Sequence, residues 1–227
     1  MLRTWFSFLV GFSLLLCSGL AFGQNQDRPE KGTVRLAPHP SLTYGRPSAD
    51  RIVLKNTEIF NDDFEGDVSS WTSEGTWAIG SPESGPGGAY ESATAAGTNL
   101  SGNHPNRADD RLVSPSLRLP EVSSGNDVIL SFYEWYQIES GFDEGVVQIS
   151  TDDGESWTTL EARSGDSGGW REEQVLLTEY AGQEVRIGFL FESDGSVTNP
   201  GWYLDDLLVF AESVDPVTTN ITNLDAR

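Results

Sequence analysis

Two segments with a two-residue apolar period restrict this chain to a β fold. Every second residue from Val128 to Ile138 is apolar except Glu134, and the same period runs from Val185 to Phe191. Side chains two residues apart point to the same face of a strand, so a sheet with one buried face produces this pattern. We expect both segments to be central strands. The exception, Glu134, would need a cationic partner in the core, and Arg186 is the partner we predict.

Other segments of the chain also show sequence patterns typical of strands and turns. Residues 144–151 and 157–162 read as a hairpin around Asp153-Gly154, a dipeptide that favours tight turns. Seven Trp, eleven Phe and six Tyr, against one Met, also favour strands over a helix bundle. About eight to eleven strands with no helical period predict an all-β fold, a two-sheet antiparallel β-sandwich or jelly roll.

The charge of the chain limits its partners. The formal net charge is −21 at pH 7, whereas nucleic acids and anionic membranes are bound through basic patches. We therefore expect no nucleic-acid partner and no membrane span. An acidic surface favours solubility and cation binding, and a solvated surface explains many of the same carboxylates.

The N-terminal residues resemble an export signal. Arg3 precedes an apolar run, and Ala21-Phe22-Gly23 fits a cleavage site, so residues 1–23 are predicted to be a signal peptide removed after Gly23. The protein would then be secreted, without internal disulfides, because Cys17 is the only cysteine. Lipidation at Cys17 is the alternative, which Leu16 disfavours. We predict a basic, Pro-containing arm at 24–56, the β-sandwich at 57–212 and a polar tail at 213–227.

An ordered set of short motifs runs through the sandwich region. In chain order the motifs are Asp63-Phe64-Glu65, Trp77-x-x-Gly80-x-Pro82, Gly97-Thr98-x-Leu100-x-Gly102, Leu112-x-Ser114-Pro115, Phe132-x-x-Trp135-x-x-Ile138-Glu139, Val147-x-Ile149-Ser150, Tyr180-Ala181-Gly182-Gln183 and Gly201-Trp202-Tyr203-x-Asp205-Asp206. The series, over roughly residues 58–211, resembles the MAM-like jelly-roll module of bacterial secreted proteins, as in the non-catalytic part of immune inhibitor A-type metallopeptidases. That resemblance implies a β-sandwich accessory or adhesion domain, often with structural calcium. The cysteines of animal MAM domains are absent.

Residues 150–157, Ser-Thr-Asp-Asp-Gly-Glu-Ser-Trp, also look like an Asp-box hairpin of the kind found in sialidases. In those proteins the aspartate and glycine shape the turn and the tryptophan packs beneath it. The resemblance therefore implies a folding device rather than catalytic machinery.

Carboxylates near both ends of the sandwich are candidate ligands for Ca²⁺, which takes six to eight oxygen ligands. Asp63 and Glu65 share strand parity, whereas only one of Asp205 and Asp206 can face them. The MAM-like resemblance implies that these strands meet, and Asp109 and Asp110 could complete the set from a neighbouring loop. The alternative is that the acids cap turns and face solvent.

Three residues of the 128–138 segment are candidates for ligand binding. Tyr133, Trp135 and Gln137 lie on the strand face opposite Phe132, where rings could stack on sugars and polar groups such as Gln137 or Arg186 could bind hydroxyls. The alternative is that both faces of this strand are covered and Trp135 is ordinary core.

The expected function is a secreted, non-catalytic binding or adhesion module for extracellular polysaccharide or protein, stiffened by calcium. No H-E-x-x-H motif is present, and we expect no nucleophile elbow of the hydrolase kind. One alternative is a small glycan-directed hydrolase that uses acidic loop residues around Asp143 and Glu144. Another is a purely structural matrix protein.

Overall fold

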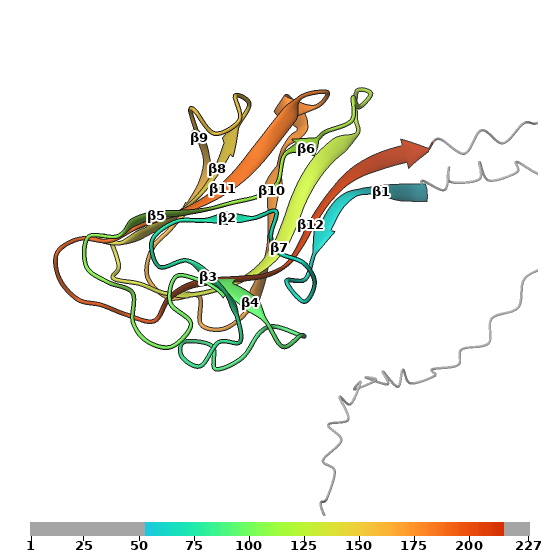
Figure 1. Cartoon of the computed structure of the whole chain (residues 1–227). Coiled ribbons are helices and arrows are strands. Elements are labelled where there is room, and N and C mark those ends of the chain that lie inside the picture. Colours follow the sequence, from blue (N-terminus) through green and yellow to red (C-terminus); the bar gives the residue numbers. More distant parts are fainter. Residues whose placement is uncertain (1–52, 216–227) are drawn as a thin grey trace, which may run out of the picture. The chain divides into compact units, whose positions relative to one another are not determined.

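A computed structural model of the chain describes residues 53–215, which form two six-stranded antiparallel sheets packed face to face (Figure 1). This confirms the predicted all-β sandwich. The only helical element in this region is one short 3-10 turn, Thr178–Tyr180, and no helix there is long and apolar enough to cross a membrane. The predicted signal peptide, Cys17 and most of the arm and tail lie outside the described residues. The predicted domain boundaries therefore remain predictions.

The first sheet has the strand order β10-β7-β12-β4-β3, and β1 also pairs with β12 (Figure 1). Its strands are β1 (Val53–Asp62), β3 (Ala78–Gly80), β4 (Ala95–Gly97), β7 (Asp127–Gln137), β10 (Arg171–Leu176) and β12 (Gly201–Asp215). β1 lies antiparallel to β12 with Asp62 opposite Leu207. The opening and closing strands of the sandwich are therefore neighbours, which brings the two acidic motifs into the same region.

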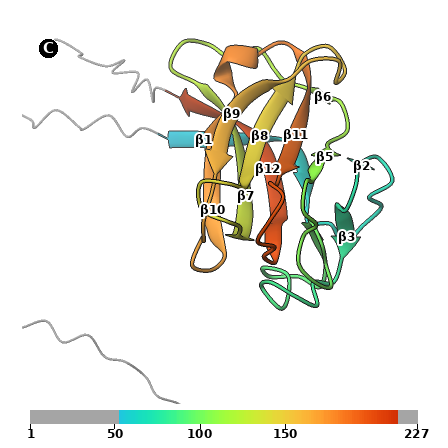
Figure 2. The ribbon, with the colours of Figure 1, turned by 90° about the vertical axis from the view of Figure 1, so that its left-hand side faces the viewer.

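The second sheet has the order β2-β5-β11-β8-β9, with β6 also paired to β11; Figure 2 shows the ribbon turned by 90°. Its strands are β2 (Thr72–Ser73), β5 (Asp109–Val113), β6 (Leu117–Arg118), β8 (Glu144–Ser150), β9 (Thr158–Arg163) and β11 (Glu184–Glu192). β8 and β9 form the predicted hairpin around Asp153-Gly154. Twelve strands exceed the predicted eight to eleven, because β2, β3, β4 and β6 have only two or three residues each.

The core lies between the sheets and has the predicted composition. The side chains of Phe132 in β7 and Phe189 in β11 are fully buried, and their rings meet edge to face with centroids 5.5 Å apart. Trp202 of β12 packs on Phe189 at 5.8 Å and on Trp77 at 5.8 Å. Edge-to-face aromatic contacts add stability beyond the area that they bury. The two-residue period therefore identified the core-facing residues of β7 and β11.

Glu134 is the charged exception in this core, and its partner differs from the predicted one. Its buried carboxylate pairs with Arg163 of β9 through Oε2, which also accepts a hydrogen bond from the Trp202 indole at 3.1 Å. The other oxygen, Oε1, accepts from Nη2 of Arg171 at 2.8 Å. Arg186 cannot take this role because it alternates with core residues of β11 and points to the outer face. The ion pair therefore joins β7 of one sheet to β9 of the other.

We expect the buried Glu134–Arg163 pair to carry more stability than the exposed end of the same network. Arg163→Met should lower the free energy of unfolding by about 3–5 kcal/mol, because it leaves a buried carboxylate without its buried partner. Arg171→Met is the matched control, since the Arg171 side chain is 44% exposed and such pairs contribute about 0–1 kcal/mol. Urea denaturation of both variants measures the difference. Equal losses would contradict this account.

Candidate functional site

Asp205 and Asp206 lie at a β-bulge in β12. From Tyr133 to Ser131, β7 advances two residues, whereas the opposing β12 advances three, from Asp205 to Leu208. The extra residue bends the strand, and Asp206 adopts the left-handed conformation with φ 48°. Upstream of the bulge β12 pairs with β4, and downstream it pairs with β1. The two carboxylates therefore stand where β12 changes its neighbour.

The Asp205 carboxylate is fully buried and holds the loop between β3 and β4. Its Oδ2 accepts a hydrogen bond from the Tyr90 amide at 2.7 Å, and Oδ1 accepts from the Asp206 amide at 2.9 Å. Burial raises the pKa of Asp205 to about 6, although these hydrogen bonds oppose the shift. Asp205 is therefore a buried acid whose charge changes at mildly acidic pH.

Glu65 binds the same loop from the other acidic motif. Its Oε1 accepts hydrogen bonds from the Ala93 amide at 2.8 Å, the Thr94 amide at 2.6 Å and the Thr94 hydroxyl at 2.7 Å. The Thr94 hydroxyl is the main cause of a lowered pKa at Glu65, and the two amides act in the same direction. The β3–β4 loop thus connects the two carboxylate motifs that the sequence placed together.

Asp206 lies near other carboxylates. Burial raises the pKa of Asp206, and the nearby carboxylates of Glu91 and Asp63 raise it further. A hard divalent cation would relieve this mutual repulsion. We call Asp63, Glu65, Asp205 and Asp206 the bulge cluster. Asp109 is placed elsewhere: it begins β5 in the second sheet, and within residues 53–215 no hydrogen bond or ion pair joins it to the bulge cluster.

A second carboxylate group, which the sequence analysis missed as a metal site, lies where the β7–β8 and β11–β12 loops meet. Glu139, Asp143 and Asp194, here named the loop cluster, each offer an oxygen within 4.8 Å of the others. Among the described residues, the carboxylates of the bulge cluster do not form a group that meets this distance. Glu139 Oε2 is buried without a hydrogen-bond partner. Burial, and then Asp194 and Asp143, raises the pKa of Glu139. These residues come from distant loops, so no spacing motif could have revealed them.

His104 packs against the loop cluster. Its Nε2 lies 3.3 Å from Asp143 Oδ2 and accepts a hydrogen bond from the Asn199 amide at 3.1 Å, while Nδ1 contacts the Pro105 carbonyl at 3.0 Å. The side chains of His104 and Asp143 are both fully buried. A substrate could therefore not reach this His–Asp pair in the described structure.

The predicted ligand-binding residues lie on the outer face of the first sheet. Tyr133, Trp135 and Gln137 are half-buried, whereas their neighbours Phe132 and Glu134 face the core. The Tyr90 ring stacks on Tyr133 with centroids 3.6 Å apart, so the β3–β4 loop already covers one of the three candidates. Trp135 meets Tyr203 edge to face at 5.6 Å.

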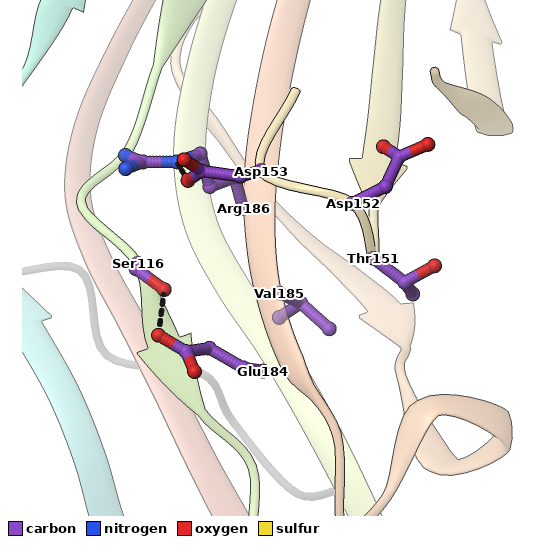
Figure 3. A pocket seen from close by; sticks show the side chains of 7 residues that line it. All are labelled: Ser116, Thr151, Asp152, Asp153, Glu184, Val185 and Arg186. Atoms are coloured by element: carbon purple, nitrogen blue, oxygen red, sulfur yellow. Dashed lines mark hydrogen bonds and ion pairs between the residues drawn. The ribbon is translucent and has the colours of Figure 1, made fainter. Parts of the chain in front are cut away.

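The outer face of the second sheet carries a groove made of two hollows. The first, of about 500 Å³, is lined by Ser116, Thr151, Asp152, Asp153, Glu184, Val185 and Arg186 (Figure 3). Figure 3 shows Asp153 of the β8–β9 turn meeting Arg186 and, farther along β11, Glu184 accepting a hydrogen bond of 2.7 Å from Ser116. The second hollow, of about 280 Å³, is lined by Thr72, Glu74, Arg111, Val113, Asp153, Gly154, Trp157 and Arg186. We call both together the outer groove.

Trp157 lies on the outer groove because β11 has no side chain beneath it. A Cβ placed on Gly188 would stand 2.6 Å from the Trp157 ring, so the ring rests directly on the backbone of the sheet. The Arg111 guanidinium lies 4.9 Å from the centroid of the same ring, and Arg111 Nε donates to Gln148 Oε1 at 3.1 Å. The sequence analysis missed this site, although Gly188 falls on the outward positions of β11 and could have indicated it.

The turn that presents Asp153 is held by Asp152. Asp152 accepts hydrogen bonds from the Ser156 amide at 2.9 Å, the Ser156 hydroxyl at 2.5 Å and the Ser150 hydroxyl at 2.7 Å. The Ser156 hydroxyl contributes most to a lowered pKa of about 2 at Asp152. Asp152 therefore acts as a turn-shaping residue, which is the role that the Asp-box resemblance implies.

The chain is similar to short regions of two known proteins. No family model matches the chain. Bacillopeptidase F of Bacillus subtilis (strain 168) is 32% identical over 160 residues, which is 69% of this chain and 11% of that protein. The pre-pro-metalloprotease PrtV of Vibrio cholerae serotype O1 (strain M66-2) is 34% identical over 112 residues, 45% of this chain and 12% of that protein. The chain thus spans only about a ninth of the length of these relatives.

Solved structures with a similar arrangement include the K3 cleaved adhesin domain of Lys-gingipain from Porphyromonas gingivalis W83. That domain is 22% identical, with a TM-score of 0.48 over 69% of this chain and 99% of its own. The C-terminal family 22 carbohydrate-binding module of Clostridium thermocellum Xyn10B is 16% identical, with a TM-score of 0.44 over 67% of this chain and 92% of its own.

Proposed function

We propose that this chain is a non-catalytic binding module of a secreted protein and that it binds extracellular polysaccharide or protein. The observation that carries the proposal is the outer groove, an open, polar and aromatic-bearing surface on a rigid sheet. An open groove of this kind suits an extended ligand. The MAM-like resemblance supports the same class of module.

The geometry around Asp143 argues against the hydrolase alternative. Glycosidases place two carboxyl groups across a cleft that the sugar can enter. The Asp143 side chain is fully buried, and its oxygens face the Asp194 amide, the Glu139 amide and His104. Glu144 is exposed at the start of β8, where Glu192 of β11 lies opposite it. Asp143 is therefore better suited to fixing the loops than to transferring protons to a substrate.

The partial relatives support a role as an accessory module. Both are named as proteases, and the matched regions make up 11% and 12% of their lengths. A β-sandwich of this size, with no catalytic constellation on its described surface, suits an appended region that holds a protein near its target. Function belongs to the site rather than to the fold, so the proposal rests on the groove.

We further propose that the module holds a structural calcium ion. At the bulge cluster, the nearby carboxylates of Glu91 and Asp63 raise the pKa of Asp206, and a cation would relieve this repulsion. The loop cluster fits because Glu139 Oε2 is buried without a partner. In either place calcium would tie loops that are otherwise joined by a few hydrogen bonds. It would supply rigidity and no chemistry.

Calcium should raise the melting temperature, and variants should locate the ion. Binding at 100 times the dissociation constant stabilises the native state by about 2.7 kcal/mol, or roughly 5–11 °C here. Asp206→Asn should abolish this rise and slightly raise the melting temperature in chelator, because it removes repulsion and asparagine tolerates the left-handed conformation. Asp194→Asn is the matched control for the loop cluster. If Asp194→Asn removes the calcium-dependent rise in melting temperature and Asp206→Asn does not, the ion lies in the loop cluster. Melting curves of the wild type that coincide with and without calcium would contradict the metal proposal.

The raised pKa of Asp205 predicts a pH dependence with a definite sign. Its pKa is about 6 in the folded chain, against 3.8 for an unperturbed group. The folded state therefore binds the Asp205 proton more tightly than the unfolded state does. The resulting contribution to the free energy of unfolding is full below pH 3.8 and is lost as the pH rises through about 6. In chelator, the stability of the wild type should increase relative to Asp205→Asn between pH 7 and pH 5. Chemical denaturation at both pH values measures this, and parallel pH profiles would count against it.

The binding function itself is tested by screening the immobilised chain, in calcium, against a glycan array and a set of extracellular matrix proteins. We expect saturable binding to at least one glycan or matrix protein, and we expect Asp143→Asn to bind it as well. No binding in either set, with a cooperative melting curve, would leave a purely structural protein as the better account.

A further inference from the structure

We propose that the outer groove binds a neutral polysaccharide chain, with Trp157 lying against a sugar ring and the flanking arginines and carboxylates bonding to its hydroxyls. The inference rests on the proposed binding function and names the ligand class and the site.

The two hollows form one path across the sheet. Both are lined by Asp153 and Arg186, whose ion pair stands between them. One hollow extends to Glu184 on β11, and the other extends to Thr72 on β2. The path therefore crosses the sheet from one side of Arg186 to the other. An extended polymer fits such a path better than a compact small molecule, for which enclosed pockets are typical.

The Trp157 ring is half-buried and held in place, with the Arg111 guanidinium over it at 4.9 Å from the ring centroid. It lies on Gly188 and borders the second hollow. Because the sheet backbone supports it directly, the ring loses little conformational freedom when a ligand is added. The C–H faces of a sugar ring are apolar and complement the face of an aromatic ring. Trp157 is the only aromatic residue that lines either hollow.

The polar groups around Trp157 are planar and held in place. Arg111 is fixed by Gln148, and Arg186 is fixed by Asp153 and by the Ser114 carbonyl, to which Nη1 donates at 3.0 Å. A guanidinium has five N–H donors in a fixed fork. Adjacent donors and carboxylate acceptors match vicinal hydroxyls, each of which can both donate and accept.

The charge of the lining selects a neutral ligand. In the second hollow Glu74 and Asp153 balance Arg111 and Arg186. In the first, three carboxylates, Asp152, Asp153 and Glu184, face one arginine. The chain as a whole has a net charge of −21. A polyanionic chain would therefore be repelled.

The same surface is a poor site for a protein partner. Protein interfaces depend on buried apolar and aromatic anchors near their centre. The large apolar residues exposed in the described region are Phe142, Leu176 and Val197, and none of them lines the outer groove. Of the two ligand classes in the proposed function, the groove therefore favours polysaccharide.

The test is affinity gel electrophoresis of the full chain in laminarin, galactomannan and hydroxyethyl cellulose, with alginate as the anionic comparison. We expect retardation by at least one neutral polymer and none by alginate. Trp157→Ala should weaken that binding at least about tenfold. Gly188→Ala should weaken it similarly, because the added methyl displaces the ring without removing it. Phe142→Ala, at an exposed aromatic residue outside the outer groove, is the matched control and should bind as the wild type does.

Each other outcome overturns the inference in a distinct way. If Trp135→Ala loses binding while Trp157→Ala and Gly188→Ala keep it, the ligand lies on the first sheet and the proposed function survives. Stronger binding to alginate would refute the charge argument. If the wild type binds no polysaccharide, the inference fails, and capture of a matrix protein decides whether the proposed function stands. If Trp157→Ala has a lower melting temperature than the wild type, its loss of binding could reflect unfolding. Glu184→Ala, at an exposed position, then tests the groove, and unchanged binding by this variant would reject the groove as the site.

Discussion

The buried carboxylate of Glu134 is the interaction on which the arrangement of the two sheets depends. An ionised carboxylate in an apolar core is strongly unfavourable unless every oxygen is paired. Here one oxygen binds Arg163 and the Trp202 indole, and the other binds Arg171. Because these partners come from β9, β12 and the start of β10, the packing of the two sheets on each other is constrained by one side chain. The Arg163 guanidinium also lies 5.5 Å from the Phe132 ring and 5.4 Å from the Trp202 ring, which couples the ion pair to the aromatic core.

Most of the fold could be predicted because the period of a strand reports which face is buried. The core residues of β7 and β11 were identified in this way, from Val128 and from Val185 onward. The same rule excludes Arg186 as the partner of Glu134, since Arg186 alternates with Val185 and Ile187. The error came from choosing a partner by charge without applying the period. Arg163 could not be chosen from its own strand, because β9 shows no clear alternation: five of its six residues are exposed or half-buried.

The sites were less predictable because they depend on irregularities and on loops. One extra residue in β12 produces the bulge at Asp206, and no residue type in that stretch signals an insertion. The loop cluster joins Asp143 to Asp194, which lie far apart in sequence and meet only because β8 pairs with β11. The motif order did bring Asp63, Glu65 and Asp205 to one region, because β1 and β12 are neighbours. Asp109 was expected to join them from a neighbouring loop, whereas strand pairing places it in β5, opposite Glu192 in the other sheet.

The outer faces of the two sheets differ in how far loops cover them. On the first sheet, the β3–β4 loop is held by Asp205 and Glu65 and places Tyr90 on Tyr133. On the second sheet, the β8–β9 turn is held by Asp152 and stands beside β11, so the face between that turn and β5 stays open as the outer groove. A ring fixed on a glycine of a central strand needs no loop to order it. In the proposed function, the second sheet would therefore present the binding surface without a rearrangement of loops, because its open face is fixed by the turn and by β11.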